Sequence, residues 1–280
     1  WAEGADWEHV MSGLVDAFRA IVVRRRSTRR FDPHRAVLFQ TLQSVLSHTQ
    51  RAPSGFNMQG WRCLLVRSPT TKQALAAPFL GNSTKVTQAP VLALFLGLRD
   101  PYPEYIRVEE RSVKAGNKQH LPSAKKQFEV AWFAQRGPCD AVALAKAAIT
   151  GVLRLFWHVP TVPLSSEAYA WKQTTIAATT FMYSCAAHDL DTCPMEGFDE
   201  IAVMKILGIN PGKYTIPIAF AVGYAFPDTP HVPPSYRLPP EELFFQESLD
   251  QSVEGVQPVV SSAGQQPQQG DGQQQNSQEL

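Results

Sequence analysis

The sequence contains a short basic turn, Arg24-Arg25-Arg26-Ser27-Thr28-Arg29, with four arginines and two hydroxyl side chains. It follows directly on a predicted amphipathic helix, because apolar residues recur at three- and four-residue steps from Trp7 to Ile21. An arginine fork binds phosphate oxygens in bidentate fashion, and serine or threonine hydroxyls add neutral hydrogen bonds. The turn is therefore a candidate phosphate site. A solvated basic surface and a nucleic-acid patch are the two alternatives.

The composition is that of a globular protein without strong charge. The chain has 280 residues, is 44% hydrophobic and carries a net charge of +1, so we expect an ordinary core and no field that attracts nucleic acid. The longest apolar runs, such as 90–96, are too short to cross a bilayer, and we expect no transmembrane segment. None of the four cysteines forms a Cys-x-x-Cys pair, so we expect packed thiols and no metal site.

The ends of the chain carry the few signals about its surroundings. It begins at Trp1 rather than Met, which fits a processed form or a fragment. This start favours the matrix of a mitochondrion or another organelle, with the cytoplasm as the alternative. The C-terminal end is mostly Gln, Gly, Ser and Pro and holds too little apolar surface to order itself. We therefore expect one domain over residues 1–246 and a disordered Gln-rich tail over 247–280.

Hydropathy patterns predict an α+β fold in which helices outnumber about four strands. Apolar runs predict three of the strands, at 61–67, 90–98 and 214–224. Helical periodicity and capping residues predict further helices at 38–46, 126–136, 141–157, 167–188 and 199–207. Residues 99–127 are polar and charged, so we expect an irregular excursion from the core there, within a variable region at about 99–140.

Three further segments hold groups that could contact a cofactor. The loop 52–61 reads Ala-Pro-Ser-Gly-Phe-Asn-Met-Gln-Gly-Trp and is either an ordinary turn or a hydrogen-bonding wall for a heteroaromatic ring. Asn82 and Lys85 are three residues apart, so one helical turn would put both on one face; a plain helix-terminal loop is the alternative. The segment 193–199, Cys-Pro-Met-Glu-Gly-Phe-Asp, is a turn that exposes backbone N–H groups, or a connector with Asp199 as N-cap.

In this order, the segments resemble the nitroreductase family. That family has Arg-x-Ser-x-Arg/Lys-x-Phe after its first helix, which is similar to 25–31 here, and a loop of the form Ala/Ser-Pro-Ser-Ser-x-Asn-x-Gln-Pro-Trp, which is similar to 52–61. Its Asn-x-x-Lys, Pro-x-Glu-Gly-Phe-Asp and basic-Leu-Pro elements resemble 82–85, 194–199 and 237–239. Gly55 and Gly60 depart from the usual Ser and Pro, and Ser235 stands where many members have Lys. One hydroxyl contact and one phosphate contact are thereby removed, and Arg26 is expected to offset the second.

The resemblance implies a central, mostly antiparallel sheet flanked by helices, in an intertwined homodimer with an extended C-terminal arm. It implies one FMN per active site, with each site built from both subunits. Arg25, Ser27 and Arg237 would hold the phosphate, Arg29 and Lys85 would lie near the flavin N1–C2=O edge, and Asn82 would bond the pyrimidine edge. The partner chain would supply Pro53, Ser54, Gly55 and Asn57, and the turn Pro194-Met195-Glu196-Gly197 would bring a backbone N–H to flavin N5. Arg24 and Arg30 are expected to be solvated neighbours.

The activity that this resemblance implies is a ping-pong cycle through flavin N5. NADH or NADPH delivers hydride, and a quinone or nitroaromatic compound then takes its place and is reduced, with no side chain needed as a general acid or base. One alternative is a specialised flavoenzyme of the same superfamily, such as a reductive dehalogenase or a flavin-cleaving enzyme, with the excursion as a lid. A nucleic-acid or partner-binding protein without enzymatic activity is the other, and the net charge of +1 counts against it.

Overall fold

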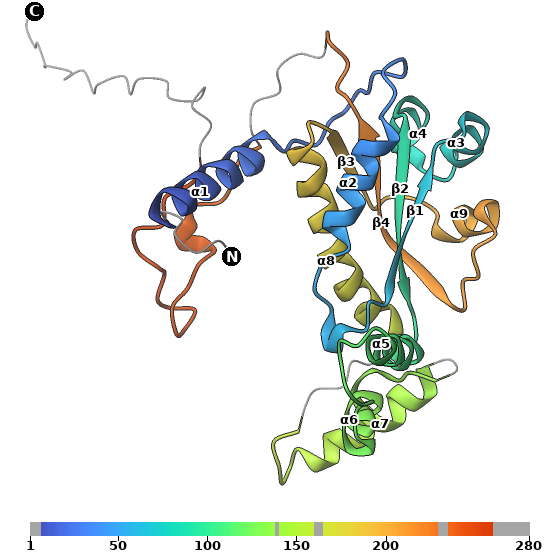
Figure 1. The fold of residues 1–280 in the computed structure, drawn as a ribbon, viewed down its shortest axis with the longest axis vertical. Helices are drawn as coiled ribbons and strands as arrows, with labels where there is room; N and C mark the ends of the chain where they lie inside the picture. The colour runs from blue at the N-terminus through green and yellow to red at the C-terminus, as the bar shows by residue number, and fades with distance from the viewer. Residues whose placement is uncertain (1–6, 138–139, 160–164, 229–234, 260–280) are drawn as a thin grey trace, which may run out of the picture. The chain divides into compact units, whose positions relative to one another are not determined.

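The computed structural model describes residues 7–137, 140–159, 165–228 and 235–259 (Figure 1). The chain forms two compact units, one of residues 24–232 and one that joins residues 1–23 to residues 233–280. Each unit is described by itself. The larger unit holds the sheet and nearly all the residues expected to form the site.

A four-stranded sheet with the order β1-β2-β4-β3 forms the centre of the larger unit, and every neighbouring pair is antiparallel. The strands are β1 (Trp61–Val66), β2 (Val91–Leu98), β3 (Asp191–Met195) and β4 (Tyr214–Gly223). All eight residues of β2 are buried, as expected for an apolar strand covered on both faces. The α+β class, the antiparallel sheet and the three strands expected from apolar runs are confirmed.

Helices cover both faces of the sheet and divide its core in two (Figure 1). On one face α2 and α8 pack Leu42 and Phe181 against Phe95 of β2. On the other, α3, α4 and α9 pack Leu75, Val86 and Val203 against the alternate residues of β2 and β4. The helix bounds in this unit are α2 (Phe39–Thr49), α3 (Pro69–Ala76), α4 (Ser83–Gln88), α5 (Tyr102–Lys114), α6 (Ala124–Ala134), α7 (Ala141–Leu153), α8 (Ser166–Ala187) and α9 (Glu200–Leu207).

The expectation of an irregular stretch at 99–127 is wrong, because α5 lies inside it. This helix buries Tyr105 and Glu109, and the Lys118 Nζ lies 2.7 and 2.6 Å from the two Glu109 carboxylate oxygens. A charged residue thus occupies a buried helical position and hides the apolar periodicity.

The fourth strand, β3, was also not located from the sequence, since Asp191-Thr192-Cys193-Pro194-Met195 is poor in β-formers and contains proline.

The smaller unit contains α1 (Trp7–Arg24), which confirms the predicted first helix and ends in the basic turn. Four apolar side chains of α1 are more than half exposed: Met11, Leu14, Val15 and Phe18. In the C-terminal part, Phe245 and Ser252 form an antiparallel bridge, while the Gln-rich residues 260–280 lie outside the described part of the chain. The extent of the domain and the disorder of the tail stay predictions. Each helix that the structure describes is too short or too polar to span a bilayer.

Candidate functional site

The basic turn lies along the outer edge of β3. Ser27 and Thr192 form an isolated parallel bridge, and the Thr28 N–H donates to the Thr192 carbonyl at 3.0 Å. Thr28 is buried by this contact, whereas Ser27 and Arg29 on either side of it are exposed. The pairing therefore fixes the backbone of the turn and leaves a hydroxyl and a guanidinium directed to solvent.

Two predicted site segments meet the basic turn at Cys193 of β3. The Lys85 Nζ donates to the Asn82 Oδ1 at 2.6 Å, which confirms that these two side chains share one face. Burial raises the pKa of Cys193, while the nearby positive charges of Lys85 and Arg29 act in the opposite direction. Arg29, Asn82 and Lys85, which are far apart in the sequence, therefore gather at this strand.

The turn that follows β3 has an exposed backbone at Glu196 and Gly197. Met195 is 2% exposed, but Glu196 and Gly197 after it are exposed, and nothing lies within 4 Å of where a Cβ on Gly197 would be. Asp199 accepts from the Ala202 N–H at 2.9 Å and caps α9, as its alternative interpretation predicted. The ring of Phe198 stacks on that of Phe79 at 4.7 Å. The turn is thus anchored on its far side and accessible at Glu196 and Gly197.

The arginines of the turn have different environments. The Arg24 Nε lies 3.2 Å from the Asp189 carboxylate, and the guanidinium of Arg30 lies 5.0 Å from the ring centroid of Phe226. The expectation that these two are merely solvated neighbours is therefore wrong, since both make structural contacts. Among the described residues, neither Arg25 nor Arg29 forms an ion pair with a carboxylate. These two cations remain available for an anion.

The loop 53–60 carries unusual backbone strain. Phe56, Asn57 and Gln59 have φ of 52°, 52° and 50°, in the left-handed region that residues with a Cβ seldom adopt. Each such residue costs about 1–3 kcal/mol, and such strain clusters at functional sites. The loop is held by the Gln59 N–H, which donates to the Ser54 Oγ at 2.9 Å, and by the buried Met58. Asn57 is exposed in this loop, whereas Met58 next to it is buried.

Neighbouring side chains account for both glycine departures in this loop. A Cβ on Gly55 would meet the Tyr169 hydroxyl at 3.0 Å, and the Gly55 N–H donates to the Gln173 Oε1 at 2.6 Å. A Cβ on Gly60 would meet the Pro101 Cβ at 3.0 Å. The Tyr169 hydroxyl is buried without a hydrogen-bond partner among the described residues, and it lies beside the position where the resemblance leads one to expect a serine hydroxyl.

Within one chain, the loop 53–60 and the basic turn lie at opposite ends of the sheet. The loop leads into Trp61, which pairs with Gly97 near the end of β2. The basic turn lies beside the start of β3, where Asp191 pairs with Gly223 of β4. Val222, the neighbour of Gly223, pairs with Val91 at the start of β2. The eight residues of β2 span roughly 24 Å at about 3.4 Å per residue. One chain therefore gathers Ser27, Arg29, Asn82, Lys85 and the turn 194–197, with Arg25 two residues before Ser27, but not Pro53, Ser54, Gly55 and Asn57. Arg237 belongs to the smaller unit, and its role stays a prediction.

Sequence reasoning missed three residues that shape these two regions. Tyr169 and Gln173 of α8 are four residues apart and so face the same way, toward Gly55. Their spacing on one helix face was the available signal, but nothing local in the sequence links that face to residue 55. Thr192 was missed because only its backbone carbonyl takes part in the contact.

Comparisons with known proteins agree with this architecture. A protein of Thermus thermophilus named NADH dehydrogenase is 31% identical over 233 residues, which are 82% of this chain and 95% of that protein. The crystal structure of a nitroreductase family protein from Streptococcus pneumoniae has a TM-score of 0.58 at 18% identity and covers 81% of this chain and 98% of its own. That of a protein from Exiguobacterium sibiricum, assigned as a nitroreductase and solved in complex with FMN, has a TM-score of 0.59 at 23% identity and covers 79% and 93%. The sequence model of the nitroreductase family matches residues 22–224, and the chain belongs to that family.

Proposed function

We propose that this protein is an FMN-dependent oxidoreductase that uses NADH or NADPH to reduce quinones or nitroaromatic compounds. The observation that carries the proposal is the convergence of Arg29, Asn82 and Lys85 on Cys193 at the strand that ends in the open Glu196-Gly197 turn. When bound, FMN supplies the ring atom N5, which accepts and returns hydride. The family and the names of the relatives support this class of reaction.

The residue types of the proposed site suit a flavin mononucleotide. Arg25 and the exposed Ser27 offer a guanidinium fork and a hydroxyl to the phosphate, with Arg237 as a third contact that stays a prediction. Arg29 and Lys85 carry positive charge that stabilises negative charge on the pyrimidine edge, and the Asn82 amide can hydrogen-bond there. The space around Gly197 lets a planar ring approach the backbone N–H of Glu196 or Gly197.

Colour is the first test of the proposal. The purified protein should be yellow, with FMN released on denaturation, and NADH or NADPH should bleach it under anaerobic conditions. A quinone or nitroaromatic compound should then restore the colour, with steady-state kinetics of the ping-pong type. A colourless protein that FMN does not reconstitute would refute the proposal.

A pair of arginine variants tests the phosphate contact. Arg25→Ala should weaken FMN binding by about 2 kcal/mol, which is roughly a 30-fold rise in Kd, because it removes a charge-assisted hydrogen bond. Arg24→Ala is the matched control, since its guanidinium is paired with Asp189 and its loss should leave FMN binding nearly unchanged. Equal Kd values for Arg25→Ala and wild type would remove Arg25 from the site.

We further propose that the active site is shared between two copies of the chain. The loop 53–57 and the basic turn of one chain lie at opposite ends of β2, which spans roughly 24 Å at about 3.4 Å per residue, and this separation supports a loop that serves the site of a second copy. The exposed apolar face of α1 offers surface for such an association. Mixed dimers of Arg25→Ala and Asn57→Ala chains provide the test, because one of their two sites would carry both defects and the other none. Recovery of activity on mixing supports shared sites, and no recovery refutes them.

A further inference from the structure

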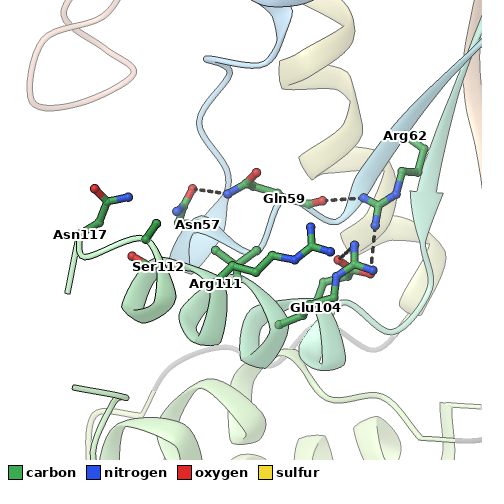
Figure 2. A pocket seen from close by; sticks show the side chains of 10 residues that line it. Asn57, Gln59, Arg62, Glu104, Arg111, Ser112 and Asn117 are labelled. Carbon is green, nitrogen blue, oxygen red and sulfur yellow. Dashed lines mark hydrogen bonds and ion pairs between the residues drawn. The ribbon is translucent and has the colours of Figure 1, made fainter. Parts of the chain in front are cut away.

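A cavity of about 370 Å³, lined mostly by polar and charged residues, lies between the strained loop, β1 and α5 (Figure 2). Asn57 and Gln59 line it from the loop, Arg62 from β1, and Glu104, Arg107 and Arg111 from α5. Its volume falls within the range of cavities that hold small organic ligands. None of its lining residues other than Asn57 is assigned a role in the proposed flavin site.

The cavity carries a net positive charge. Three guanidinium groups face one carboxylate: the Arg62 Nη2 lies 2.9 Å and the Arg107 Nη2 2.7 Å from the oxygens of Glu104. Arg111 is exposed, and it forms no ion pair within the part of the chain that the structure describes. Because Arg107 and Arg111 are four residues apart on α5, both point to the same side of the helix.

Arg62 connects the arginines of the cavity to the strained loop. The Arg62 Nη1 donates to the Gln59 carbonyl at 3.1 Å, and the Gln59 Nε2 lies 3.4 Å from the Asn57 Oδ1 (Figure 2). Glu104 therefore holds Arg62 against the loop and holds Arg107 in place on the helix. Ser112 and Asn117 add a hydroxyl and an amide near Arg111. Guanidinium forks together with neutral donors are the groups that bind phosphate oxygens.

We propose that this cavity binds phosphate groups of the dinucleotide that donates hydride, with Arg111 as the main contact and Arg107 beside it. The proposal rests on the proposed function, in which Asn57 reaches the flavin bound by the partner chain. A nicotinamide stacked on that flavin would extend its pyrophosphate and adenosine away from the ring, and a basic cavity that shares Asn57 with the flavin site can receive them. The 2′-phosphate of NADPH and the pyrophosphate common to NADH and NADPH offer the same chemistry.

Steady-state kinetics of the FMN-loaded Arg111→Ala enzyme test the proposal, with a quinone held at saturation and NADPH or NADH varied. The KM for the donor should rise about 10-fold, which is less than the effect expected of Arg25→Ala because Arg111 is exposed to solvent, and kcat should change less than about 2-fold. A rise with NADPH alone identifies the 2′-phosphate as the bound group, and a rise with both donors identifies the pyrophosphate. Either result supports the proposal.

Lys114→Ala is the matched control, because Lys114 is an exposed cation on the same helix that does not line the cavity. The KM values of Lys114→Ala should equal those of the wild type. That result would show that the rise in KM of Arg111→Ala does not come from a general loss of positive charge. Unchanged KM values for both donors in Arg111→Ala and in the Arg107→Ala/Arg111→Ala double variant overturn the proposal. If the wild type is yellow and is bleached by NADH or NADPH, that failure leaves the proposed function intact; a colourless wild type that FMN does not reconstitute refutes the function itself.

Discussion

Gly97→Ala is the substitution whose cost can be worked out most directly from this structure. Gly97 lies in β2 beneath α8, where a Cβ would stand 2.6 Å from the Thr174 Oγ1, 2.9 Å from the Ala170 Cβ and 3.1 Å from the Ala170 carbonyl oxygen. Carbon contacts this short are repulsive, and one of the partners is helix backbone that cannot rotate away. The first half of α8 must therefore shift from the sheet by several tenths of an ångström or more.

Overpacking of a well-packed core costs typically 1–3 kcal/mol, and the backbone contact puts Gly97→Ala near about 3 kcal/mol. For a domain of this size that corresponds to a fall in Tm of roughly 6–10 °C. The shift also moves Gln173, which accepts from the Gly55 N–H at 2.6 Å, so the strained loop should loosen and activity should fall with stability.

Thermal and urea unfolding of the variant measure the effect, with Gly151→Ala as the control. Gly151 lies inside α7 with nothing within 4 Å of a built Cβ, so alanine there should stabilise the helix by up to about 1 kcal/mol. If Gly97→Ala unfolds at the wild-type midpoint, the close approach of α8 to β2 is incorrect, and so is the account of how α8 holds the loop.

Three further outcomes are expected. Lys85→Met should weaken FMN binding and slow reduction by NADPH in stopped-flow measurements, because it removes positive charge at Cys193; an unchanged rate would contradict the placement of Lys85. Asp199→Ala should lower the free energy of unfolding by about 1 kcal/mol in urea titrations, since it removes the cap on α9, and a loss under about 0.3 kcal/mol would count against that cap. Burial raises the pKa of Cys63 from 9.0 to about 12, so between these values the unfolded chain loses a proton that the folded chain keeps, and stability should fall as pH rises. The Cys63 side chain is only partly buried, so the raised pKa should protect it as a neutral thiol, and rapid alkylation by iodoacetamide in the native protein at pH 9, read by mass spectrometry, would contradict that raised pKa.

Local patterns were sufficient to predict most of the sheet and helices. The fully buried β2 and the long α8 were predictable, because an apolar run and a capping serine act over a few neighbouring residues; the sequence left the cap open between Ser165 and Ser166, and the structure has it at Ser165. α5 was not, because its buried Glu109 is neutralised by Lys118, nine residues along the chain. β3 was not, because tertiary pairing with β4 overrides the low strand propensity of its residues.

The candidate site also has parts that were predictable from the sequence and parts that were not. The residue types of the basic turn, the Asn82–Lys85 pair and the Glu196-Gly197 turn were predictable from a family resemblance, and the structure supplies their convergence on Cys193. The contacts of Tyr169 and Gln173 with Gly55 were not predictable, because these two residues belong to a helix more than a hundred residues away in the sequence. The separation of the loop from the turn is a consequence of strand register, which no single segment encodes.

The outer edge of β3 has a consequence for the solubility of the protein. An unpaired strand edge is a template on which other chains can add as further strands. Here the Thr28 N–H already donates a hydrogen bond to the Thr192 carbonyl. Pro194, two residues further along the same edge, has no N–H to donate to an incoming strand. The residues that shape the candidate cofactor site thus also block edge-to-edge aggregation. Variants that detach the basic turn from β3 should therefore be prone to precipitate as well as inactive.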